Sequence, residues 1–453
     1  MANVRPAAVA GAFYPGDARA LLTELDELLE TVDSFAPRFG HPKALIVPHA
    51  GYIYSGGVAA HAYSELSAAR GVVRRVVMFG PVHRVAVRGL ALPAADAFDT
   101  PLGRIPVDRD AVKAASALPQ VVASAPAHAM EHALEVQLPF LQRVLGEFSL
   151  VPFAVGDASP EQVAQVIERL WGGPETLIVL STDLSHYHAY EDARRIDGST
   201  LDRIEHLSTD LLHDEACGAT PLNGLLRVAR AKGLKIRRLA ACNSGDTAGG
   251  RGRVVGYASF ALDEAATVTE ADAGQALVEI ARVAITASLG LGVKPHADAP
   301  AWQKQPGATF VTLKKGGDLR GCIGSLEAQR PLGEDVAANA VSAAFKDPRF
   351  PAVTAAEWPQ VEVEVSVLST PRVLRFADEA ELLDAIVAGE DGLILESEGH
   401  RGTFLPQVWE SIPDKRQFLA ELKRKAGLPA DMRITRCKVL RYRVLKFLQP
   451  PLH

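Results

Sequence analysis

Residues 44–47, Ala44-Leu45-Ile46-Val47, form a short apolar run that leads directly into Pro48-His49-Ala50-Gly51-Tyr52. A continuous apolar run of this length is typical of a strand that is buried on both faces of a sheet. The proline and glycine that follow indicate a turn or loop. The segment therefore predicts a buried strand with a histidine, His49, just beyond its carboxyl end.

The same arrangement recurs at two other places in the first half of the chain. The apolar run 76–79 leads into His83, and the run 177–180 leads into His186. In open α/β sheets, ligands bind in the crevice beyond the carboxyl ends of the strands. His49, His83 and His186 are therefore expected to face one crevice, although a single loop histidine is more often only a hydrogen-bonding residue.

Apolar runs alternate with amphipathic segments throughout the first 264 residues. Asp17 is a plausible N-cap for the first amphipathic segment. Strands that alternate with helices predict an α/β domain with a mainly parallel sheet flanked by helices. Helices are expected at 18–29, 131–145 and 160–170, and further strands at 150–154 and 254–262.

A segment rich in Ala, Glu, Asp and Thr, residues 263–274, predicts a domain boundary. We place the domains at 1–264 and 269–453. The second half combines one helical pattern with several strand patterns, which predicts a smaller α+β domain. The helix is expected at 275–289 and the strands at 308–314, 360–368, 392–396 and 436–447.

Composition limits the classes of function. A chain of 453 residues exceeds the size of a single core. The net charge of −6 gives no indication of nucleic-acid binding. The four cysteines form no CxxC pair, and the sequence has neither a signal-peptide pattern nor a long uncharged apolar run. We therefore expect a cytoplasmic protein that does not enter a membrane.

Three more residues are candidates for a metal site. His132 is expected at the start of a helix, and Asp246 lies in a polar turn before the strand at 254–262. Two histidines and one carboxylate form the arrangement that binds non-haem Fe(II). Asp246 is therefore the favoured third ligand beside His49 and His83. Cys242 is its rival, because a thiolate also binds Fe, Cu or Zn.

Tyr52 and Asp183 are neighbours of the expected ligands in sequence, and we consider both as substrate-binding residues. Each has a simpler interpretation that stays open. Tyr52 equally fits a packing residue, and Asp183 equally fits a cap in the turn before a helix.

Taken together, residues 4–262 resemble the Memo family. The resemblance is specific because long segments occur in the same order. They are Arg5 with Ala10 to Pro15, Pro48 to Tyr52 with Ser55-Gly56, Gly80 to His83, Glu131 to Phe140, Ser181 to Tyr187, and Ser244 to Asp246.

The Memo family is similar in fold to the class III extradiol dioxygenases, which open catechol rings with Fe(II). The resemblance implies that His49 and His83 are metal ligands, that Asp246 lies near the third ligand, and that His186 is an acid/base residue. It implies a second pocket histidine at His132, which we expect to be catalytic beside His186. Memo proteins are not generally established as ring-cleaving enzymes, so the activity does not follow from the fold.

Residues 270–448 resemble the AMMECR-type domain. The segments that carry this resemblance are Leu319 to Gly324, Ala344-Phe345, Asp347 to Phe350, Gly392 to Leu395, and Gly402 to Val408. Arg320 is a candidate for binding a carboxylate or phosphate. Cys322, flanked by glycines, is a candidate for a second site, although it equally fits a small buried side chain.

The leading expectation is a metal-dependent redox or oxygenase-type enzyme that binds one divalent transition metal, Fe(II) first and Cu or Zn as alternatives. Its substrate would be a small molecule. In prokaryotes the two modules often occur beside a radical-SAM protein, which implies such a protein as a partner. The alternatives are a Zn-dependent hydrolase and a non-catalytic metal carrier or protein-interaction module, since animal Memo proteins act in signalling.

Overall fold

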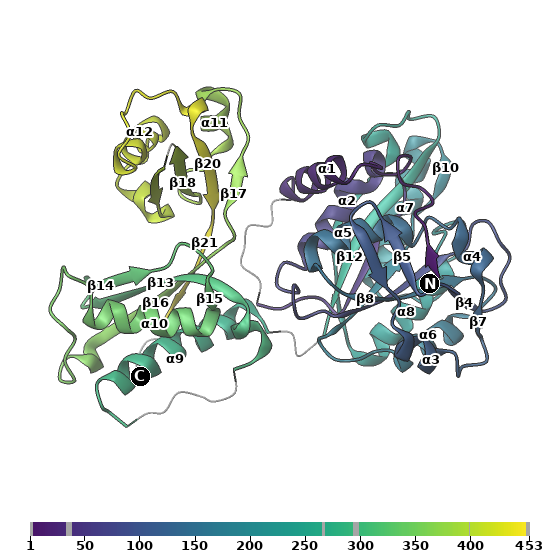
Figure 1. The fold of residues 1–453 in the computed structure, drawn as a ribbon, viewed down its shortest axis with the longest axis horizontal. Coiled ribbons are helices and arrows are strands. Elements are labelled where there is room, and N and C mark those ends of the chain that lie inside the picture. Colours follow the sequence, from purple (N-terminus) through teal and green to yellow (C-terminus); the bar gives the residue numbers. More distant parts are fainter. Residues whose placement is uncertain (1–2, 33–38, 265–267, 293–298, 398, 450–453) are drawn as a thin grey trace. The chain divides into compact units, whose positions relative to one another are not determined.

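The computed structural model describes residues 3–32, 39–264, 268–292, 299–397 and 399–449, and these form two compact units (Figure 1). The first unit takes the described residues up to 264, apart from Phe39. The second unit consists of Phe39 and the described residues from 268 onward. The predicted organisation in two domains is confirmed, and the proposed cut between 264 and 269 stays a prediction.

The first unit is built on a mixed sheet, in which nine strands can be followed within the described residues. Its central strands pair in parallel and those toward its sides pair mostly antiparallel. The predicted α/β class is confirmed, with parallel pairing only in part of the sheet. In spatial order the strands are β10 (His186–His188), β12 (Val254–Asp263), β2 (Ala44–Val47), β9 (Thr176–Ser181), β3 (Arg75–Pro81), β8 (Ser149–Val155), β4 (Leu90–Leu92) and β7 (Val121–Ala123), with β11 (Lys235–Asn243) also paired to β12.

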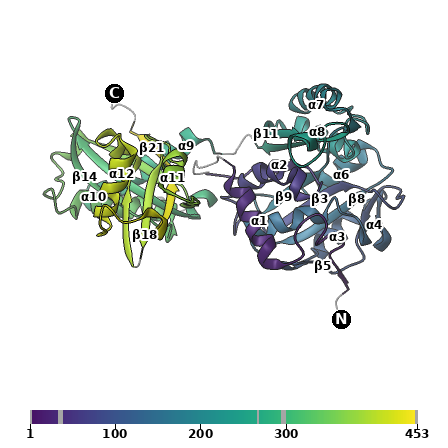
Figure 2. The ribbon, with the colours of Figure 1, turned by 90° about the horizontal axis from the view of Figure 1, so that it is seen from above.

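Helices cover both faces of this sheet (Figure 1 and Figure 2). Successive residues of β2 point to opposite faces, so Leu45 packs in one core and Ile46 in the other. Every residue of β2 is buried, as its apolar run predicts. The hydrophobic core on the Leu45 face contains side chains of α1 (Ala18–Glu30), α2 (Tyr52–Ser64) and α5 (Leu138–Leu145). The hydrophobic core on the Ile46 face contains side chains of α3 (Arg109–Ala115), α6 (Pro160–Arg169), α7 (Tyr190–Glu205) and α8 (Ala219–Lys232).

The start of one of these helices was predicted correctly from the sequence, and the start of another was not. Asp17 caps α1, because its side chain accepts a hydrogen bond from the backbone N–H of Ala20. The expected helix over 131–145 begins later than predicted. Residues 131–134 form a loop, followed by the short helix η1 (Glu135–Gln137) and then α5. The remaining short elements of this unit are β1 (Val4–Arg5), β5 (Ala97–Thr100), β6 (Gly103–Pro106), α4 (Ala125–Ala129) and η2 (Ser244–Asp246).

The parallel centre of the sheet brings three polar loops to one edge. Val47 at the end of β2 pairs in register with Ser181 at the end of β9, and Leu180 of β9 pairs with Phe79 of β3. Because the three strands run in the same direction, the residues that follow them emerge side by side. The loop 131–134 adds further polar side chains near this edge.

The second unit contains two antiparallel sheets, and its predicted α+β class is confirmed. Helices α9 and α10 pack on the first sheet, and α11 and α12 contribute to the core of the second. The elements are α9 (Glu270–Ser288), η3 (Ala301–Lys304), β13 (Pro306–Lys315), β14 (Asp318–Gly324), β15 (Arg330–Pro331), α10 (Leu332–Phe345), η4 (Trp358–Gln360), β16 (Val361–Leu368), β17 (Arg372–Leu374), α11 (Glu379–Ala385), β18 (Gly392–Ser397), β19 (His400–Phe404), η5 (Pro406–Glu410), α12 (Lys415–Lys425), η6 (Ile434–Arg436), β20 (Lys438–Tyr442) and β21 (Val444–Leu448).

Across the described ranges, no helix combines the length and the apolar character that crossing a bilayer requires.

Phe39 provides a test of the domain boundary. Its ring packs against Trp302 and Phe447, with centroids 5.7 Å apart in both pairs, although it precedes the first unit's β2 in sequence. Fragments 1–264 and 269–453 should each unfold cooperatively in urea. The second fragment lacks Phe39 and should be less stable than the same domain in the full chain, by about 3 kcal/mol if the loss resembles a Phe-to-Ala change in a core. An insoluble fragment would contradict the proposed cut, and equal stability would contradict the role of Phe39.

Candidate metal centre

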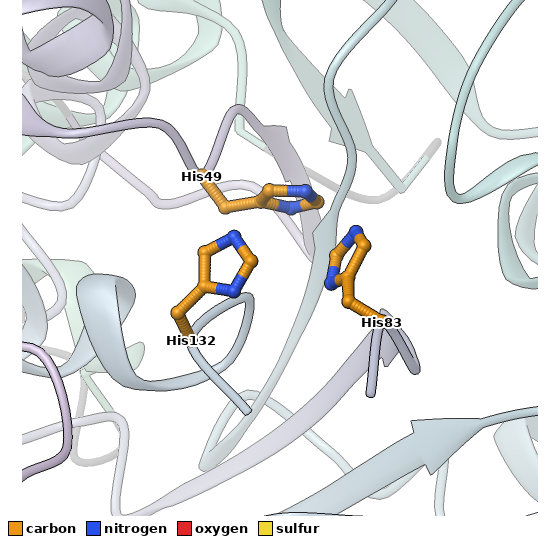
Figure 3. Close-up of side chains that lie close together, drawn as sticks. All are labelled: His49, His83 and His132. Atoms are coloured by element: carbon orange, nitrogen blue, oxygen red, sulfur yellow. The ribbon is translucent and has the colours of Figure 1, made fainter. Parts of the chain in front are cut away.

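Three histidine side chains converge beyond the ends of the central strands (Figure 3). His49 follows β2, His83 follows β3, and His132 lies in the loop before η1. Their nearest ring nitrogens all lie within 4.8 Å of one another. The ring centroids are 5.2 Å apart for His49 and His83, 5.5 Å for His49 and His132, and 4.7 Å for His83 and His132. This spacing allows one small ion to contact all three rings.

The hydrogen bonds of Ser181 determine which nitrogen of His49 carries its proton. The Ser181 hydroxyl has one proton, which it donates to the carbonyl of Ala133 at 2.7 Å. Nδ1 of His49 lies 2.8 Å from the same hydroxyl oxygen and must therefore donate to it. The proton of a neutral His49 ring is thus on Nδ1. Nε2 keeps its lone pair for another partner.

Gln137 supports this arrangement from behind. Its side-chain oxygen accepts a hydrogen bond from the hydroxyl of Tyr63 at 2.8 Å, which fixes the orientation of the amide. Its nitrogen then donates to the carbonyl of Pro48 at 2.8 Å and to the Ser181 hydroxyl at 3.0 Å. The loop that carries His49 is therefore tied to η1, which follows the loop that carries His132.

One carboxylate contacts both of the other rings. Oε1 of Glu131 lies 2.9 Å from Nδ1 of His83 and 3.4 Å from Nδ1 of His132. Oε2 accepts a hydrogen bond from the backbone N–H of His83 at 2.7 Å. With Nδ1 directed at the carboxylate, Nε2 is the nitrogen of His83 and His132 that is left for an ion.

Burial keeps two of the imidazoles, those of His49 and His132, in the form that binds a metal. Burial, together with the nearby His83, lowers the pKa of His49 to about 3. Burial and the nearby His49 lower the pKa of His132 to about 4. Burial raises the pKa of Glu131, but hydrogen bonds from the His83 ring and the backbone of Ala133 outweigh it and lower that pKa to about 2. At neutral pH, neutral His49 and His132 therefore lie beside a charged Glu131.

Asp183 positions His49 from the other side. One carboxylate oxygen accepts a hydrogen bond from the backbone N–H of His49 at 2.7 Å, and the second lies 3.9 Å from Nε2 of the same residue. Burial raises the pKa of Asp183, and the hydrogen bond from His49 partly opposes the rise. A cation near His49 would stabilise this carboxylate in its charged form. The donors and the charges around the three rings therefore fit a transition-metal ion.

The structure does not bring the expected third ligand, Asp246, to His49 and His83. Its carboxylate accepts hydrogen bonds from the hydroxyl of Tyr190 and from the backbone N–H of Asn243, and so caps the short helix η2. The third ring beside His49 and His83 is that of His132. The rival ligand Cys242 lies on β11, where it lines a groove of about 1090 Å³ beside α1 and α2 and not the histidine cluster.

His186 lies near the cluster without being part of it. Its Nδ1 is 2.8 Å from the carbonyl of Leu184, so Nδ1 donates and Nε2 is the nitrogen left to accept a proton. It lies close enough that a positive charge on its ring would lower the pKa of both His49 and Asp183. The next residue, Tyr187, has a φ of 63°, an uncommon left-handed conformation that often accompanies functional sites.

Tyr52 lies in the apolar core and not in the centre. Its ring packs against Phe140 and its hydroxyl donates to the carbonyl of Val136 at 2.8 Å. The simpler interpretation, a packing residue, therefore describes this tyrosine better than substrate binding does.

Sequence analysis missed Cys217, whose sulfur lies 3.3 Å from Nε2 of His49 and 3.3 Å from the backbone N–H of Asp183. It also missed the roles of Ser181 and Glu131. The position of Glu131 beside His132 was the only available signal. Cys217 lies in a loop before α8, 168 residues from His49, with no motif around it.

Arg320 and Cys322 have structural partners in the second unit. Arg320 donates to the carboxylate of Glu357 at 2.8 Å, and the backbone N–H of Cys322 donates to Asp347 at 2.9 Å. The glycine before Cys322, Gly321, allows β14 to approach α10, because a Cβ there would lie 2.3 Å from the carbonyl oxygen of Ala343. Close packing thus explains this glycine without a ligand.

The lowered pKa values predict how the metal-free protein responds to acid. An unfolded histidine binds a proton below about pH 6.5, whereas folded His49 does so only near pH 3. The unfolded state therefore binds more protons between these values, and stability falls as the pH falls. His49 should lower the free energy of unfolding by about 2 kcal/mol between pH 6.5 and 5, and His132 should act in the same direction.

Urea denaturation of the chelator-treated protein at pH 7, 6 and 5 measures this loss. A His49→Ala variant should show a weaker dependence on pH than the natural chain. Equal slopes for the two proteins would contradict the burial of a neutral His49.

Two family models match the two units separately. Residues 5–261 match the family model of the Memo-like protein, and residues 278–447 match that of AMMECR1. A MEMO1 family protein of Aquifex aeolicus is 36% identical over 271 residues, which cover 56% of this chain and 97% of that protein. A MEMO1 family protein of Aeropyrum pernix is 34% identical over 290 residues, covering 56% and 98%. An uncharacterized protein from Pyrococcus horikoshii, with a solved structure, is 35% identical and covers 39% of this chain and 91% of its own, with a TM-score of 0.35.

Proposed function

The chain belongs to the Memo family, and from that premise we propose that its N-terminal domain is a metal-dependent enzyme in which His49, His83 and His132 bind one divalent transition-metal ion. One observation carries this proposal. The rings direct Nδ1 toward Ser181 or Glu131, so each offers Nε2 to a common ligand, which at His49 would replace the contact with the Cys217 sulfur at 3.3 Å. Outer partners of this kind orient metal-binding histidines in many proteins.

Imidazole ligands suit Fe, Zn, Cu and Ni. We favour Fe(II), because the Memo fold is similar to that of the extradiol dioxygenases. A bound ion would supply Lewis acidity and, in the case of iron, reactivity toward O₂.

The chain's own residues would bind and orient a small substrate and move a proton. His186 is the proposed acid/base residue, since its Nε2 has no part in the bond to Leu184. Asp183 and Ser181 would hold His49 in one orientation and one tautomer. His83 is open to solvent and marks the side from which a substrate would approach.

A second reaction class has one observation in its favour. Three histidines and no carboxylate among the candidate ligands form the set that carbonic anhydrase uses for Zn²⁺. Metal-assisted hydrolysis is therefore the alternative to oxygen chemistry. Uptake of O₂ by the iron-loaded protein would favour the first, and ester or amide hydrolysis by the zinc-loaded protein the second.

The choice of ligands is tested by comparing two variants purified without oxygen. His132→Ala should bind the ion at least about tenfold more weakly, since it lacks one of three donors. Asp246→Ala should keep the affinity of the natural chain, because its carboxylate is engaged with Tyr190 and Asn243. Competition with a chelator measures both affinities. The reverse pattern would restore Asp246 as the third ligand.

A further inference from the structure

Glu131 is more fully enclosed than the two histidines it contacts. Its side chain is 2% exposed, against 29% for His83 and 18% for His132. Besides the two Nδ1 contacts, Oε1 accepts a hydrogen bond from the backbone N–H of Ala133 at 2.9 Å. Both oxygens are therefore engaged with the loops that carry the two histidines, and neither is directed at solvent.

No lysine or arginine side chain pairs with this carboxylate within the described ranges. The guanidinium of Arg5, which reaches this loop, pairs with Glu135 and donates to the backbone carbonyls of His128 and Glu131. A buried carboxylate without a cation is costly. Three N–H donors stabilise the charged form of Glu131, and a cation bound on the other side of the imidazoles would compensate its charge.

We infer that Glu131 is the positioning residue of this centre: a single carboxylate that orients His83 and His132 together and supplies the negative charge that favours a divalent ion. The inference rests on the proposed function, because it requires that these histidines bind a metal. A carboxylate behind a ligand histidine fixes the ring and increases its basicity. One carboxylate that serves two ligands links the orientation of both rings to the same side chain.

The test replaces Glu131 in the full chain, with Co²⁺ as the probe. Glu131→Gln keeps the size of the side chain and removes its charge, and should weaken Co²⁺ binding by about 10- to 100-fold. It should also shift the visible absorption bands of the bound Co²⁺, because His83 loses a charged acceptor and His132 loses the negative charge beside its ring. Glu131→Asp retains the charge and should recover part of the affinity. Glu161→Gln, a change at an exposed carboxylate, should alter neither property.

The outcomes separate the role of Glu131 from the existence of the metal centre. If Glu131→Gln binds Co²⁺ with natural affinity and spectrum, or only unfolds at a lower temperature, Glu131 is a structural residue and the inference is wrong. If Glu131→Gln does not fold, Glu131→Asp decides: a shifted spectrum supports the inference, and unchanged affinity and spectrum overturn it. If His49→Ala and His83→Ala bind Co²⁺ like the natural chain, the metal centre itself is wrong.

Discussion

His49→Ala should be isolated without a bound ion under anaerobic conditions in which the natural chain retains one per molecule. His49 is the most deeply buried of the three histidines, and the bond to Ser181 leaves its Nε2 free of a proton. Loss of an outer partner typically weakens a metal site by about 10- to 100-fold. Loss of a ligand should cost more, on the order of 10³-fold. Elemental analysis of the purified proteins measures the occupancy, and a Co²⁺ titration measures the affinity.

His206→Ala is the matched control, because this histidine lies exposed at the end of α7. It should retain the ion. Circular dichroism would establish that His49→Ala is folded, as expected from a change whose backbone bond to Asp183 is preserved. A folded His49→Ala protein with one ion per molecule would contradict the proposed ligands.

His186→Ala should keep the ion and lose turnover by about 10²-fold or more, which is the usual contribution of a positioned acid/base group. The residue is close enough to influence His49 and Asp183 electrostatically, yet it is not one of the three clustered rings. Metal content and O₂ consumption by the iron-loaded protein, with a panel of dihydroxylated aromatic acids, measure the two properties separately.

The neighbouring His188→Ala is the control for His186, since both residues belong to β10. It should leave metal content and turnover unchanged. If His186→Ala loses the ion as completely as His49→Ala, His186 is a ligand. If it retains both the ion and full turnover, a non-catalytic metal carrier becomes the better interpretation.

The sequence predicted the strands and two of the three clustered histidines, because both depend on local patterns. Apolar runs such as 76–79 predict buried strands, and parallel strands end at a common edge, so His49 and His83 were expected to meet. The third histidine was harder to assign. His132 was expected at the start of a helix, but the chain continues as a loop until η1, and this loop directs the ring to the other two.

The remaining parts of the centre depend on contacts that no local pattern records. Asp246 follows a glycine and precedes a strand, which suited a ligand, yet its carboxylate is used to cap the short helix in which it lies. Ser181 and Cys217 contact His49 only because a strand end 132 residues away and a loop 168 residues away fold against it. Such contacts require the whole tertiary structure. The radical-SAM partner, inferred from resemblance alone, stays a prediction.

X-ray absorption spectroscopy on anaerobically purified protein tests the metal centre most directly. We expect one transition-metal ion per chain, with three imidazole nitrogens at about 2.0–2.2 Å and the multiple-scattering signature of histidine rings. An ion with only oxygen or sulfur neighbours, or a chain that takes up no stoichiometric ion from Fe²⁺, Zn²⁺ or Cu²⁺, would contradict a centre built on His49, His83 and His132.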